Sequence, residues 1–293
     1  MRDPVLTQEL RVLCMNENNK IVIFSPHFDD AMFSCAGTIA DFIKQGREVI
    51  VCTVFSGKSL SNNLSEFAKK ICSSNSVEMR EEENDRIVHL MGAKSVNLGY
   101  LDAIFRLDSN GICIHDSWKK IFNSCISDNN ERKLLQDILV KISNVVRTEK
   151  ADFYFPLSIG NHIDHCLVNT VAKMLIERFK LNNIIFYEDL PYANKGDICG
   201  NLESAYEVVN CNVIDIEYKI KAISGYHYGL SIGDGSDKIL SEIEQYALKL
   251  NPELGCCERF WRFKQSGVWK IIRLLKLFSL VAQWQERHPP CFI

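Results

Sequence analysis

The chain has 293 residues, of which 46% are hydrophobic, and its formal net charge is −3 at pH 7. These values allow a substantial core and give no electrostatic reason to expect a nucleic-acid partner. The N-terminus lacks the apolar segment of a secretory signal, and no stretch reaches the roughly 18 uncharged apolar residues of a membrane span. The 12 cysteines are scattered and form no C-x-x-C motif. We therefore expect reduced thiols in a cytoplasmic protein without a transmembrane segment.

Strand and helix signals alternate from residue 20 to about residue 210. An apolar strand at 20–24 is followed by a helix that ends at Gly46 and by a second strand at 48–55. Strand, helix and strand in so short a span predict a right-handed parallel pair. Periodicity places further elements later in the chain: strands at 95–100, 151–155, 184–187 and 206–210, and helices at 76–91, 131–150 and 163–179. The predicted fold class is therefore α/β, with a Rossmann-like, doubly wound and mainly parallel sheet.

Two polar segments interrupt this alternation. Residues 56–75 are rich in Ser, Asn and Lys, and we expect them to form a surface insertion near the mouth of the site. Residues 106–130 are predicted to be irregular. Both segments are positioned to shape a pocket at the end of the sheet.

The last part of the chain has a helical period. Helices are predicted at 215–226 and 236–250, so we expect a helical C-terminal extension over about 211–293. Together with a core at about 20–210, it would form one domain over residues 1–293.

Residues 268–284 combine tryptophan, leucine and phenylalanine with regularly spaced basic residues. We expect a helix here that packs on the core or on a second subunit of a homo-oligomer. The alternative is peripheral membrane contact through anionic lipid, which we do not favour.

A cluster of polar side chains follows the first strand. His27, Asp29 and Asp30 lie within four residues, directly after the apolar stretch and before a helix. The carboxyl edge of a parallel sheet is where open α/β folds place their chemistry. Capping of the helix would account for one aspartate, but it leaves the histidine unexplained.

A second cluster follows the strand at 151–155. His162 and His165 are three residues apart where a helix begins, so their side chains project from similar faces. Joined to His27 and Asp30, His165 would complete a set of two imidazoles and one carboxylate, which suits zinc and leaves a fourth position for water. Iron(II) can use the same ligands. Asp29 would then be free to act as a base.

Both clusters carry a family resemblance. The motif His27-Phe28-Asp29-Asp30, with Ala36-Gly37-Thr38 behind it, and the motif His162-Ile163-Asp164-His165 resemble those of the PIG-L/LmbE-like family of zinc-dependent N-deacetylases. The segment Glu188-Asp189-Leu190-Pro191-Tyr192 is similar to a further landmark of that family.

The resemblance implies a role for each residue of the two motifs. The metal ligands would be His27, Asp30 and His165, and Asp29 would be the general base. A protonated His162 would stabilise the oxyanion or assist the leaving amine, and Asp164 would orient a histidine from behind.

Two residues depart from the family pattern. Phe28 replaces the usual proline, and Ala31 replaces a glutamate that is not a metal ligand. We therefore expect metal binding to survive, with some local hydrogen bonding lost.

The resemblance implies hydrolysis of an N-acetylated amino sugar to acetate and a free amine. We expect an N-acetylglucosaminyl small-molecule glycoside, such as an aminoglycoside antibiotic precursor. Arg80, Asp102 and Tyr192 are candidate substrate contacts by position. The alternatives are a zinc amidase or deacetylase of low-molecular-weight thiol metabolism, and a non-catalytic sugar-binding protein, for which the loss of the carboxylate at Ala31 is the support.

Overall fold

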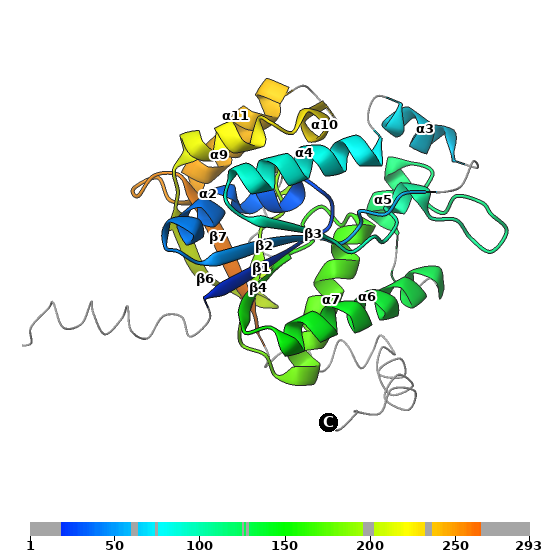
Figure 1. The fold of residues 1–293 in the computed structure, drawn as a ribbon, viewed down its shortest axis with the longest axis horizontal. Coiled ribbons are helices and arrows are strands. Elements are labelled where there is room, and N and C mark those ends of the chain that lie inside the picture. The colour runs from blue at the N-terminus through cyan, green and yellow to red at the C-terminus, as the bar shows by residue number, and fades with distance from the viewer. Residues whose placement is uncertain are drawn as a thin grey trace, which may run out of the picture.

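The computed structural model describes residues 19–59, 64–73, 76–124, 126, 129–195, 202–231 and 236–264. Within them, one seven-stranded sheet has the order β3-β2-β1-β4-β5-β7-β6 (Figure 1). The first five strands in this order are parallel: β3 (Lys94–Asn97), β2 (Glu48–Thr53), β1 (Lys20–Ser25), β4 (Ala151–Pro156) and β5 (Ile184–Tyr187). The predicted α/β class with a mainly parallel sheet is confirmed.

Helices cover both faces of this sheet (Figure 1). One face carries α2 (Asp30–Lys44), α4 (Val77–Leu90), α9 (Ile216–Ile223) and α11 (Ser236–Leu250), and the other carries α6 (Asn129–Thr148) and α7 (Ile163–Phe179). Strand β1 shows why two layers are needed. Ile21 and Ile23 pack into one core and Val22 and Phe24 into the other, because successive side chains of a strand point to opposite faces.

The C-terminal extension is helical over α9 and α11, with the short helix α10 (His227–Ser231) between them. The extension also contributes a strand to the sheet, and the sequence analysis did not predict this strand. Strand β7 (Cys257–Phe263) lies antiparallel between β5 and β6 (Tyr206–Val213). Three charged residues interrupt the apolar pattern of β7, and two of them are paired inside the protein: Glu258 with Lys219 and Arg259 with Glu188.

The two polar segments contain short helices that the sequence analysis missed. They are α3 (Glu66–Cys72) and α5 (Trp118–Asn123), and a 3-10 turn η1 (Ala103–Phe105) lies between them; a second 3-10 turn is η2 (Tyr192–Lys195). Ala68, Ile104 and Ile121 from the first three bury together in a small third core beside the sheet edge. No helix in the described part of the chain is long and apolar enough to cross a membrane. Residues 268–284, for which we expect a helix, lie outside the described residues.

Candidate active site

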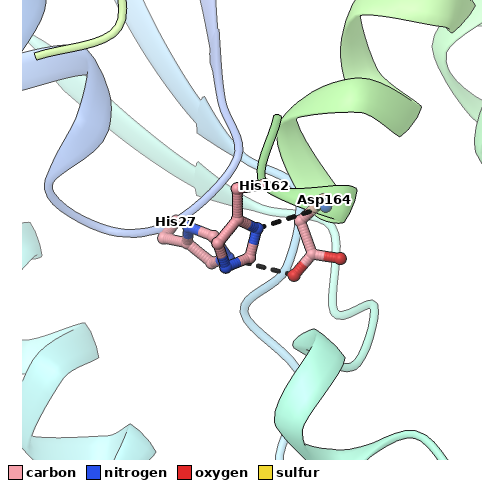
Figure 2. A group of neighbouring side chains, drawn as sticks. All are labelled: His27, His162 and Asp164. Carbon is pink, nitrogen blue, oxygen red and sulfur yellow. Dashed lines mark hydrogen bonds and ion pairs between the residues drawn. The ribbon is translucent and has the colours of Figure 1, made fainter. Parts of the chain in front are cut away.

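The two motifs meet at the carboxyl ends of β1 and β4, which are adjacent parallel strands. The strand order 3-2-1-4-5 reverses direction between these two strands, and ligands of open α/β sheets bind at such a reversal. His27 and Asp30 lie where β1 passes into α2, and His162 and His165 lie where β4 passes into α7. Figure 2 shows His27 next to His162 and Asp164.

The structure brings together the three predicted metal ligands. Oδ2 of Asp30 lies 3.2 Å from Nδ1 of His27 and 3.2 Å from Nε2 of His165. Tetrahedral zinc with bonds of about 2.0–2.1 Å separates its ligand atoms by roughly 3.3 Å, so these spacings fit the ion. Nε2 of His165 is buried and has no hydrogen-bond partner among the described residues. A buried donor or acceptor without a partner is costly, and a bound ion would remove that cost.

Each ligand histidine has a buried carboxylate on its other ring nitrogen. Oδ2 of Asp164 lies 3.0 Å from Nε2 of His27, and Oδ1 of Asp189 lies 2.7 Å from Nδ1 of His165. Such carboxylates fix the tautomer and the ring orientation of a metal-binding histidine. Asp164 was predicted to orient a histidine, and here it contacts His27. The sequence analysis did not predict a site role for Asp189, although it named the segment after β5 that contains this residue.

His27, His162 and Asp164 form a second close group of donor atoms. Asp164, however, is already engaged. Its carboxylate accepts hydrogen bonds from Arg106 and from the backbone N–H of Ala103, and its own N–H donates to Nδ1 of His162. The donor set of His27, Asp30 and His165 therefore fits a metal better.

Asp29 is positioned to act beside this set rather than within it. It occupies the position before α2, but its side chain makes no capping hydrogen bond, so capping of the helix does not explain it. Burial and the neighbouring Asp30 carboxylate raise the pKa of Asp29, which favours a role as a base near neutral pH. Its carboxylate contacts Gly229 of α10, where an added Cβ would lie 3.1 Å from Cγ of Asp29.

His162 caps the N-terminus of α7 by accepting the hydrogen bond from Asp164 N–H at 3.3 Å. Burial and the nearby His27 lower the pKa of His162 well below its usual value. This environment favours the neutral ring, whereas the sequence analysis expected a protonated His162. Because Nδ1 accepts, the proton resides on Nε2, which can still donate to an oxyanion.

A cavity of about 340 Å³ opens in front of these groups. The three residues predicted to contact substrate, Arg80, Asp102 and Tyr192, all line it, with Arg80 Nη1 at 3.9 Å from Asp102 Oδ2. Apolar side chains complete the lining. Four come from the segments predicted as polar, namely Ile71 of α3 and Trp118, Ile121 and Phe122 of α5, and Ile104 of η1 lies between these segments.

The two departures from the family pattern are accommodated by packing. Phe28 is buried, and the guanidinium of Arg80 lies 5.6 Å from the centre of its ring. Ala31 lies in the first turn of α2 and is buried in the core. Neither residue removes a donor from the candidate metal site.

Comparison with known proteins is consistent with this geometry. The family model described as GlcNAc-PI de-N-acetylase (PIG-L) matches residues 22–176, more than half of the chain. The 2'-N-acetylparomamine deacetylase of Niallia circulans is 26% identical over 197 residues, which are 61% of this chain and 70% of that protein. The enzyme of the same description from Streptomyces fradiae is 28% identical over 199 residues, 67% of this chain and 63% of that protein.

Among solved structures, a deacetylase from the biosynthesis pathway of teicoplanin superposes with a TM-score of 0.73. The match covers 84% of this chain and 99% of that one at 19% sequence identity. It supports the fold described above.

Proposed function

Because the chain belongs to the PIG-L family of GlcNAc-PI de-N-acetylases, we propose that it hydrolyses the acetamide of an N-acetylated amino sugar. The observation that carries this proposal is the pairing of two features at one cavity. The donor set of His27, Asp30 and His165 fits zinc, and the Asp29 carboxylate lines the same cavity without capping α2.

The proposed mechanism gives each of these groups a role. Zinc held by His27, Asp30 and His165 would act as a Lewis acid and lower the pKa of a water molecule toward about 7. Asp29 takes a proton from the attacking water as the water oxygen bonds to the acetamide carbonyl carbon. Nε2–H of His162 donates to the developing oxyanion, an interaction worth roughly 3 kcal/mol. Asp29 then delivers the proton to the departing nitrogen, so that acetate and a free amine are released.

We propose an N-acetylglucosaminyl glycoside of the antibiotic-precursor type as the substrate. Two relatives are described as 2'-N-acetylparomamine deacetylases. Arg80 and Asp102 in the cavity lining offer a donor and an acceptor for sugar hydroxyls, and the apolar side chains of α3 and α5 in the same lining can cover the rest of the molecule. A cytoplasmic location and a homo-oligomer remain predictions.

The alternatives are a deacetylase or amidase of low-molecular-weight thiol metabolism and a non-catalytic sugar-binding protein. Both can be tested with the purified, zinc-loaded chain. Release of acetate and of amine would be measured from 2'-N-acetylparomamine, from N-acetylglucosamine linked to inositol or malate, and from acylated thiol conjugates. We expect turnover of the aminoglycoside precursor above that of the thiol precursors.

The matched control is Asp29→Ala. We expect it to keep its zinc and to lose turnover by orders of magnitude, since it lacks only the base. Binding of all these sugars without any acetate release would favour the non-catalytic alternative, and equal turnover by Asp29→Ala would reject the assignment of the base.

A further inference from the structure

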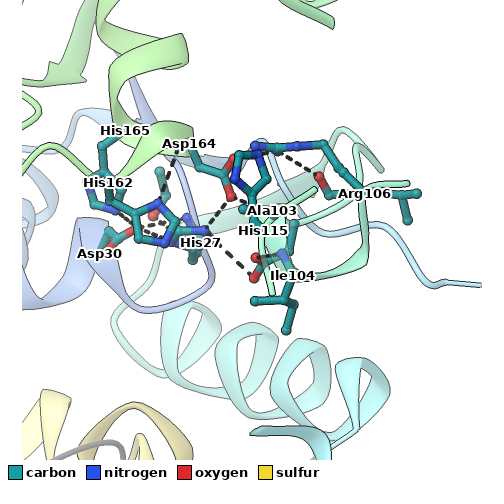
Figure 3. A network of polar contacts seen from close by, with 12 residues as sticks. His27, Asp30, Ala103, Ile104, Arg106, His115, His162, Asp164 and His165 are labelled. Atoms are coloured by element: carbon teal, nitrogen blue, oxygen red, sulfur yellow. Dashed lines mark hydrogen bonds and ion pairs between the residues drawn. The ribbon is translucent and has the colours of Figure 1, made fainter. Parts of the chain in front are cut away.

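Behind the candidate metal site, a line of buried ionisable side chains runs away from the cavity. Asp164, which contacts Nε2 of His27, also accepts a hydrogen bond from Nη1 of Arg106 on its other oxygen. Figure 3 shows Asp164 between His27 and Arg106. Arg106 follows η1, far from either motif in the sequence.

Arg106 is itself held in place by several contacts. Its Nε donates to Oε1 of Glu131 at 3.1 Å, its Nη1 also donates to the carbonyl of Leu101 at 3.3 Å, and its guanidinium lies 5.5 Å from the centre of the Phe55 ring. Glu131 lies in the first turn of α6, where the helix dipole favours a negative charge.

The line ends at His115. Its Nε2 lies 2.8 Å from the same Oε1 of Glu131, and its Nδ1 lies 3.1 Å from the hydroxyl of Ser124. Asp164, Glu131 and His115 are each at most 1% exposed. Buried ion pairs contribute little net stability, because desolvation of the charges offsets their attraction. Stability alone therefore does not account for a line of such groups that ends on a metal ligand.

We propose that Arg106, anchored by Glu131 and His115, is the positioning residue of the metal site. Arg106 fixes one oxygen of Asp164, so the other oxygen is aimed at Nε2 of His27. That contact keeps the proton of His27 on Nε2 and leaves the Nδ1 lone pair directed at the position between Asp30 and His165. None of Arg106, Glu131 and His115 lines the cavity, so the inference concerns metal affinity and not substrate binding.

The test measures zinc affinity by competition with a chromogenic chelator, without substrate. Arg106→Lys keeps the charge but cannot bridge Asp164 and Glu131. We expect it to weaken zinc binding by about 10- to 100-fold, the range found when partners behind metal ligands are changed. Glu131→Gln should weaken binding in the same direction but less, because Arg106 keeps its contact with Asp164.

The matched control is Arg47→Lys. Arg47 and Arg106 are both buried, with 8% of each residue exposed. Arg47 also pairs with an aspartate, since its Nη2 lies 2.6 Å from Oδ2 of Asp152. It lies beside the first residue of β2, at the opposite end of the sheet from the site. We expect zinc affinity within about twofold of the parent for Arg47→Lys, since no partner of a ligand is touched.

An unchanged affinity in Arg106→Lys would overturn the proposal, and so would an equal loss in Arg47→Lys. If Arg106→Lys does not fold, Glu131→Gln decides, and parental affinity there would reject the positioning role. The inference rests on the proposed zinc site. Its readout is metal binding, so a failure to find the substrate would leave this result standing, and a failure of this test would leave deacetylation intact.

Discussion

The backbone N–H of Asp164 donates to Nδ1 of His162, and this hydrogen bond fixes which nitrogen of His162 carries the proton. The same contact caps α7, so helix formation and preparation of the oxyanion donor are one event. His162→Ala should lower kcat by about 10²- to 10³-fold through loss of that donor. It should also cost about 1 kcal/mol of stability through loss of the cap.

One further variant separates these effects. His162→Asn restores a capping side chain, so it should recover most of the stability but little of the kcat, because its amide is too short to reach the oxyanion. Zinc content should match the parent in both variants. A loss of zinc on replacing His162 would instead place this residue among the ligands.

The position of the Asp29 carboxylate should require glycine at residue 229. A Cβ at residue 229 would contact the Asp29 carboxylate and lie 3.1 Å from Cζ of Phe33. Glycine to alanine in a helix is ordinarily stabilising by up to about 1 kcal/mol, but here we expect Gly229→Ala to lower both the melting temperature and kcat. Its effect on stability should shrink in an Asp29→Ala background, which a double-mutant cycle would measure.

Gly225→Ala is the control for this cycle, since the atoms nearest to its Cβ would be Cδ1 and Cγ1 of Ile87 and the Ala222 carbonyl oxygen at 3.1–3.4 Å, away from Asp29. Additive effects of Gly229→Ala and Asp29→Ala would show that the two residues do not contact each other.

Asp189→Asn should weaken zinc binding by about 10- to 100-fold. The amide keeps the size of the side chain but removes the negative charge that faces Nδ1 of His165 at 2.7 Å. Isothermal titration of the metal-free protein with zinc would measure the change. Asp152→Asn, which disturbs the pair with Arg47, should bind zinc like the parent, and parental affinity in Asp189→Asn would remove Asp189 from the site.

Asp164 should make the metal-free protein sensitive to acid. Burial disfavours its charge, but Arg106 and the hydrogen bond from His27 outweigh burial and hold its pKa well below the usual range. A carboxyl with a depressed folded-state pKa stabilises the protein above its unfolded pKa of about 4, and this contribution is lost as the pH falls toward the folded value.

Urea unfolding of the metal-free protein between pH 6 and pH 3 would measure this loss. In the parent, the free energy of unfolding should decrease as the pH is lowered. In Asp164→Asn, which is already less stable at pH 6, it should decrease less steeply. Parallel curves for the two proteins would mean that Asp164 does not contribute to the acid sensitivity.

The sequence predicts those elements whose signals are local. Helix α7 begins and ends at the predicted residues, Ile163 and Phe179, because its cap, its apolar period and its end are all encoded in one stretch. The grouping of His27, Asp30 and His165 was also predictable, because each motif follows a buried strand and parallel strands end at one edge.

Features that depend on distant partners were not predictable. Strand β7 was missed because Glu258 and Arg259 break its apolar pattern, and only the fold supplies their partners, Lys219 and Glu188. The sequence analysis assigned no role to Arg106 or Glu131, because their partners also lie far away in the sequence. Helices α3 and α5 were missed because they are short and bury only a few residues each, such as Ala68 and Ile121, against a core that local sequence does not reveal.

The antiparallel strand β7 also sets the order in which the protein can be completed during synthesis. Every candidate ligand and its carboxylate partner has been made by residue 189, and β5 pairs with β4, but among the described strands β6 joins the sheet only through β7, which begins at Cys257. Until that strand leaves the ribosome, β5 presents an open edge of the kind that pairs with other chains. The nascent chain thus carries a full set of metal ligands before the sheet is complete. Strand β7, the last described strand, then pairs with the exposed edge of β5.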